Sequence, residues 1–80
     1  MSYPYGPNIK RDYHGWKLED ALLDIDRHVS GIRQLRDCKD LELITGHGVI
    51  QLEAMKLLHE YGLKPTIQLG NSGVIVCMVE

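Results

Sequence analysis

The sequence lacks the features that mark several large classes of protein. No apolar run approaches the roughly 20 residues that a helix needs to span a bilayer, so no membrane protein is expected. Residues 1–5 contain neither a basic nor an apolar region, which argues against a signal peptide. With only two cysteines, Cys38 and Cys77, no disulfide framework is expected. These absences together predict a cytoplasmic protein.

The sequence also has no excess of positive charge. Its formal net charge is -2 at pH 7, whereas a protein that coats nucleic acid without specificity is basic. This balance leaves room for a local basic patch. No CxxC pair or cluster of histidine and cysteine indicates structural zinc. A chain of 80 residues, 44% of them hydrophobic, has room for one domain with one sheet and about two helices. Formation of a homodimer would stabilise so small a domain further.

The hydrophobic pattern predicts an α/β domain over residues 9–80 with the element order β-α-β-α-β-β. Two prolines and a glycine within residues 1–8 predict a flexible N-terminal arm. Strands are expected over 9–13, 41–45, 64–69 and 74–79, and apolar stripes of helical period run over 17–35 and 50–61. A turn of glycine, asparagine and serine should join the last two strands into a hairpin. The last strand is nearly all apolar, so we expect burial on both of its faces, including Val76, and burial of Leu22 in the first helix.

Two histidines beside glycines lie in matching turns of this pattern. His14 follows the first predicted strand in the segment Asp12–Gly15, and His47 follows the second in Thr45–Gly48. The carboxyl ends of parallel strands meet at one edge of a sheet, where ligands usually bind. We therefore expect these two strands to be parallel and both rings to lie at that edge. The helix N-termini beside them attract anions, so the sequence predicts a phosphate-handling site.

Three motifs together resemble the Smr (small MutS-related) domain: Asp12–Gly15, Thr45–Gly48 and Asn71–Gly73, in this order and at this spacing. The resemblance covers nearly the whole predicted domain. It implies a two-layer sandwich like the C-terminal domain of translation initiation factor three. It also implies nucleic-acid binding and, in many members, endonuclease activity that nicks DNA or cleaves RNA. The chain departs from the family pattern at Arg11, where leucine is usual, and after Gly48, where small or hydroxylated residues are common.

The resemblance and the chemistry of phosphodiester cleavage select the catalytic candidates. Imidazole titrates near neutral pH and can act as a base or an acid, so His14 and His47 form the expected pair. Asp12 would orient a ring, anchor an arginine or supply one metal ligand. In RNA the 2′-hydroxyl can be the nucleophile without a metal, whereas cleavage of DNA by water would require a divalent metal such as Mg²⁺. The expectation we favour is metal-independent cleavage of RNA.

Further residues are expected to bind phosphate. They are the glycines of the two turns and four basic side chains: Gly15, Gly46, Gly48, Lys10, Arg11, Lys17 and Lys64. Structural interpretations stay open, since the histidines and Asp12 would also suit a purely local role in their turns. Trp16 would serve either core packing or base stacking. The alternative functions are a non-catalytic nucleic-acid-binding module, or a domain that binds a small phosphate ligand or a protein.

Overall fold

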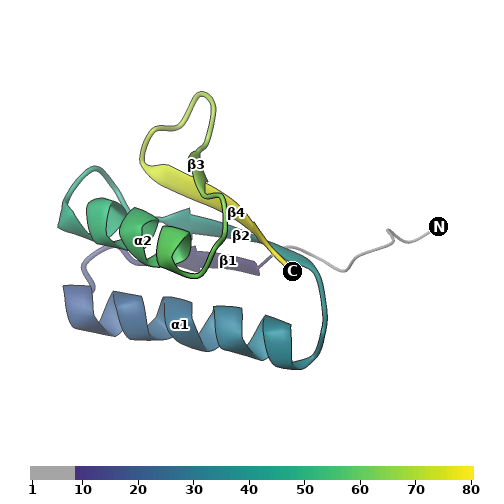
Figure 1. Ribbon diagram of the computed structural model, residues 1–80. Helices are drawn as coiled ribbons and strands as arrows, with labels where there is room; N and C mark the ends of the chain where they lie inside the picture. The colour runs from purple at the N-terminus through teal and green to yellow at the C-terminus, as the bar shows by residue number, and fades with distance from the viewer. Residues whose placement is uncertain (1–8) are drawn as a thin grey trace.

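The computed structural model describes residues 9–80, so the arm predicted over residues 1–8 lies outside the described residues. The elements are β1 (Ile9–Asp12), α1 (Leu18–Gln34), β2 (Lys39–Ile44), α2 (Val49–Glu60), β3 (Thr66–Ile67) and β4 (Val74–Val79). The predicted order of elements is therefore confirmed (Figure 1). β3 is much shorter than the strand predicted over 64–69.

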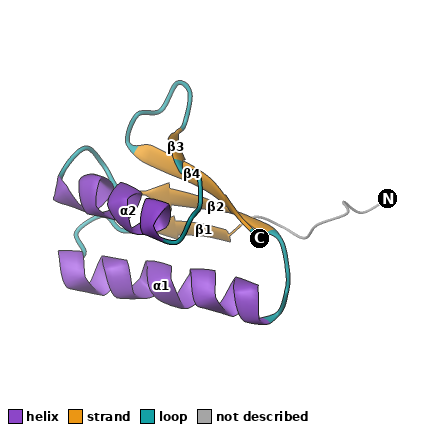
Figure 2. Ribbon diagram, in the orientation of Figure 1, coloured by secondary structure: helices purple, strands orange, loops and turns teal. Residues whose placement is uncertain are grey.

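The four strands form one mixed sheet in the order β1-β2-β4-β3. β1 and β2 are parallel, with Ile9 opposite Leu41 and Asp12 opposite Ile44. This pairing confirms the parallel arrangement predicted for the two strands that precede the histidine turns. β4 is antiparallel to β2 on one side and to β3 on the other, which confirms the predicted hairpin. The fold is thus a small mixed α/β domain of two helices and a four-stranded sheet (Figure 2).

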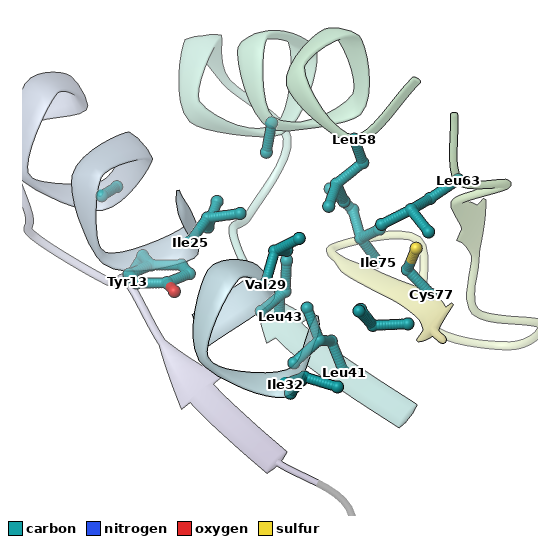
Figure 3. Packing of buried hydrophobic residues seen from close by; sticks show 13 residues of the cluster. Tyr13, Ile25, Val29, Ile32, Leu41, Leu43, Leu58, Leu63, Ile75 and Cys77 are labelled. Atoms are coloured by element: carbon teal, nitrogen blue, oxygen red, sulfur yellow. The ribbon is translucent and has the colours of Figure 1, made fainter. Parts of the chain in front are cut away.

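The core lies between the sheet and the two helices, which cover one of its faces. Leu41 and Leu43 of β2 alternate with polar neighbours and point toward the helices. Ile25 and Val29 of α1 meet them, while Leu58 of α2 lies beside β4 (Figure 3). Neither helix of the part that the structure describes is long and apolar enough to cross a membrane.

The expected burial of β4 on both faces holds only in part, because Val74 is buried on the second face but the next two positions of that face are not. Ile75 and Cys77 are buried under the helices, but Met78 is 46% exposed and Val76 is only half-buried. No helix covers the second face of the sheet within residues 9–80 (Figure 1). Leu22 is also only half-buried, because it lies at the flank of the buried stripe of α1.

Both helices end in the same hydrogen-bonded motif. At the end of α2, Gly62 adopts φ 82° and donates its N–H to His59, and the N–H of Leu63 reaches back to Leu58. This is the Schellman arrangement, in which a glycine takes the left-handed conformation just past the helix end. At the end of α1 the equivalent left-handed position is occupied by Arg36, with φ 53°. A non-glycine residue is strained in this conformation.

Candidate functional site

The three motifs that are far apart in the sequence meet at one end of the sheet. The backbone N–H of Tyr13, just past β1, donates to the carbonyl of Ile44 at the end of β2 (2.9 Å). The N–H groups of Thr45 and Gly46 both donate to the carbonyl of Gly73, at 2.9 and 3.0 Å. The two histidine turns and the turn before β4 are therefore neighbours, and the N-termini of both helices lie at the same end (Figure 1).

In the first turn, Asp12 holds the backbone. Its Oδ1 accepts the N–H of His14 at 2.9 Å, and Gly15 follows with φ 78°. The side chain of His14 is exposed. The carboxylate of Asp12 thus fixes the backbone of the turn that carries His14.

In the second turn, the ring of His47 has a defined partner. Its Nε2 lies 2.6 Å from Oγ of Ser72, in the turn before β4. Gln51, in the first turn of α2, donates its side-chain N–H to the carbonyl of Ser72 at 2.7 Å. A methyl group on Gly73 would meet Gly46 Cα at 3.4 Å and His47 Cε1 at 3.6 Å, so the two turns are in van der Waals contact.

Ser72 and Gln51 are residues that sequence reasoning missed. The only signal was the composition of Asn71–Gly73, which predicts a turn and says nothing of a contact with a residue 25 positions earlier. The contact arises because β4 lies next to β2 in the sheet, which brings the start of β4 to the end of β2.

The basic residues assigned to phosphate binding do not gather in one place. Lys17 is the N-cap residue of α1 and lies beside the first histidine turn. Lys10 lies within β1 and pairs with Glu42 at 3.3 Å. Lys64 lies near Arg33 of the last turn of α1 and near Glu80, at the opposite end of the sheet from the histidines. Lys64 is therefore not part of the rim that was expected around the two turns.

Arg11 also has a structural task, which explains how the chain accommodates it where leucine was expected. Its guanidinium contacts both carboxylate oxygens of Asp24 in α1, at 2.9 and 3.3 Å. The hydroxyl of Tyr13, a fully buried side chain, donates to the same carboxylate at 2.8 Å, and His28 Nδ1 lies 3.5 Å from it. Arg11 thus ties the edge strand β1 to α1.

This network shifts the pKa values of its members. Burial acts to raise the pKa of Asp24, but the hydrogen bonds from Arg11 and Tyr13 and the charges of His28 and Arg11 outweigh it, so the pKa lies below the usual 3.8. Burial, followed by the hydrogen bond to Asp24, raises the pKa of Tyr13 well above the usual 10.0. The folded state therefore favours an ionised Asp24 and a neutral Tyr13.

The donor set does not fit a metal held by the protein alone. Within residues 9–80, no group of three or more histidine, cysteine, aspartate or glutamate side chains could hold a metal ion together. Asp12 offers one carboxylate, and one of its oxygens already accepts a backbone N–H. The described residues of this site therefore do not fit Mg²⁺.

Comparison with known proteins adds no relative: no family model, no curated protein and no solved structure matches the chain. The structure itself defines the class, a small mixed α/β domain in which two glycine-flanked histidines lie at the carboxyl ends of adjacent parallel strands.

Proposed function

We propose that this chain is an Smr-like nucleic-acid-binding domain that cleaves RNA, with His14 and His47 as its acid–base pair. The observation that carries the proposal is the convergence of the three motifs at one end of the sheet. Adjacent strands are about 4.8 Å apart, so turns that follow their paired ends are close enough to act on one phosphate group.

The first turn of α2 is the better phosphate-binding position of the two helix starts. Its N-cap is Gly48, no side chain caps it, and its first turn contains no acidic residue. By contrast, α1 begins with Glu19 and Asp20. The positive end of a helix dipole favours an anion, and acidic side chains oppose one. A phosphate beside His47 would therefore accept hydrogen bonds from the backbone N–H groups in the first turn of α2. Lys17, at the start of α1, would approach the same phosphate.

The proposed reaction is a transesterification within RNA. The 2′-oxygen attacks the adjacent phosphorus while one neutral imidazole takes the proton of the 2′-hydroxyl. The bond from phosphorus to the 5′-oxygen breaks, and the other imidazole, protonated at the start, gives its proton to that oxygen. The products are a 2′,3′-cyclic phosphate and a 5′-hydroxyl, and the two rings return to their starting states by exchanging protons with water.

Ser72 is the positioning residue in this scheme. A hydrogen bond of 2.6 Å fixes the direction of the His47 ring, and Gln51 fixes the turn that presents the hydroxyl. An exposed histidine without such a partner would sample several rotamers, and this freedom would have to be lost before the proton transfer.

The test uses labelled single-stranded and double-stranded RNA and DNA, each with and without chelator. We expect cleavage of RNA that persists in chelator, ends in a 2′,3′-cyclic phosphate, and stops when the 2′-hydroxyl at the cut is replaced by hydrogen. Substitution of alanine for His14 or His47 should lower the rate by about 10²–10⁴-fold, as expected for loss of an acid or base. His59→Ala is the matched control, since His59 is exposed in the last turn of α2, at the far end of that helix.

Each alternative function has its own outcome in this experiment. Binding of RNA without cleavage at any pH would leave a non-catalytic nucleic-acid-binding module. Cleavage that chelator abolishes and that both alanine variants retain would show that a metal does the chemistry elsewhere. Binding of inorganic phosphate or a mononucleotide, with no binding of any nucleic acid, would favour the alternative of a domain that binds a small phosphate ligand.

A further inference from the structure

An open groove of about 550 Å³ begins at the first histidine turn and follows the exposed side of α1. Gly15 and Trp16 line its start, and Leu23 and Arg27 line it farther along the helix. Trp16 is 37% exposed and Leu23 is 50% exposed. The groove therefore combines an aromatic ring and an apolar side chain with cationic groups, immediately next to His14.

Contacts with two neighbouring side chains fix the position of the Trp16 ring. Its edge-to-face contact with buried Tyr13 has a centroid distance of 5.1 Å and an interplanar angle of 79°. The guanidinium of Arg11, itself paired with Asp24, lies 5.7 Å from the ring centroid. A ring fixed in this way loses little conformational freedom when a second flat group stacks on its exposed part.

The charges around the groove favour an anionic strand. Lys17 and Arg27 form no ion pair with any residue of the described range 9–80, whereas the carboxylate of Asp24 is already paired with Arg11. Asp20 is the one acidic side chain that opposes them. By contrast, the groove on the uncovered face of the sheet is lined by two carboxylates, Asp40 and Glu42, and by one cation, Lys64, and Glu42 pairs with Lys10. That lining offers no excess of positive charge to phosphate.

We propose that this groove binds an unpaired nucleobase of the strand whose scissile phosphate lies between His14 and His47. Trp16 is the stacking platform, and Lys17 and Arg27 contact the phosphates on either side of the stacked base. The inference rests on the proposed function and names its substrate class: a single-stranded or locally unpaired segment, because a base within a duplex cannot lie flat on the ring.

Trp16 is the only tryptophan of the chain, so its fluorescence reports directly on the groove. The probe is a short single-stranded oligodeoxyadenylate, which lacks the 2′-hydroxyl and stays intact. We expect it to quench the fluorescence of Trp16 with a saturable curve. The same strand in a duplex, and an abasic strand of equal length that keeps the phosphates, should quench far less.

Substitutions separate stacking from charge, with affinity measured by anisotropy of the labelled oligodeoxyadenylate. Trp16→Leu should weaken binding by about 5- to 150-fold, the range of base–aromatic stacking, while Trp16→Phe should keep most of the affinity. Lys17→Gln and Arg27→Gln should weaken it more than Lys64→Gln, which removes the same charge at the opposite end of the sheet. Thermal denaturation of each variant checks that the domain stays folded, and the two charge variants keep the proposal testable if Trp16→Leu does not fold.

The outcomes distinguish this inference from the proposed function. An oligodeoxyadenylate that binds by anisotropy without changing the fluorescence of Trp16 would overturn the groove and leave the histidine site standing. Equal quenching by the abasic strand would also overturn it, since phosphate contact alone would then explain the signal. Quenching by single strands together with a complete absence of RNA cleavage would support base binding in the groove and refute the proposed nuclease activity.

Discussion

Replacing Tyr13 with phenylalanine tests whether the network around Asp24 stabilises the fold. The ring of Tyr13 is fully buried, so phenylalanine keeps its packing and removes only the hydroxyl that donates to Asp24 at 2.8 Å. A hydrogen bond to a charged group contributes about 1.5–3 kcal/mol. The Asp24 side chain is 15% exposed, so water replaces part of the lost bond, and we expect the free energy of unfolding to fall by about 1–2 kcal/mol at neutral pH.

The pH dependence of this difference follows from the two shifted pKa values. The pKa of Asp24 is lowered in the folded state, so the stability contributed by its ionised form is present above 3.8 and is lost as the pH falls through the folded value. The pKa of Tyr13 is raised, so above 10.0 the unfolded chain loses a proton that the folded chain keeps, and stability falls as the pH rises. Wild type should therefore exceed Tyr13→Phe most between these limits and by less on either side.

The assay is urea denaturation of wild type and Tyr13→Phe below pH 3.8, at neutral pH and above pH 10. The same substitution in an Asp24→Asn background completes a double-mutant cycle and should cost less there, because the acceptor has lost its charge. A difference that stays constant across pH, or an equal cost in both backgrounds, would refute the assignment of this hydrogen bond to the stability of the domain.

Three further predictions concern the core, the helix ends and the site. Ile75→Ala should lower the free energy of unfolding by about 2–5 kcal/mol and Val76→Ala by about 1 kcal/mol, because only Ile75 faces the helices. Equal losses of stability in chemical denaturation would show that both faces of β4 are covered. Gly62→Ala should destabilise by about 1 kcal/mol and Arg36→Gly should stabilise by a similar amount, since both positions have positive φ; thermal melting that moves in one direction for both would contradict this. Ser72→Ala should lower kcat for RNA cleavage by about tenfold with little change in KM, and Ser72→Thr should restore it; a change in KM alone would assign Ser72 to binding.

Local patterns in the sequence were enough to predict the elements and their order. Helical periodicity placed both helices correctly, and the apolar run before the C-terminus placed β4 at Val74–Val79. The two histidine turns could be assigned to one edge because strands joined through a helix tend to be parallel, and the pairing of Ile9 with Leu41 confirms it. These features depend on neighbours in the chain, which a single sequence displays.

The partners of individual side chains depended on the tertiary structure. Hydrophobicity predicted a doubly buried β4, but only the arrangement of layers shows that both helices cover the same face and leave Met78 exposed. Lys64 and Arg11 were assigned to a phosphate rim by their charge, yet the fold places Lys64 at the far end of the sheet and pairs Arg11 with Asp24. The contact between His47 and Ser72 exists because β4 adds beside β2. Such pairings join residues far apart in the sequence, and local propensity carries no information about which of them the packed chain brings together.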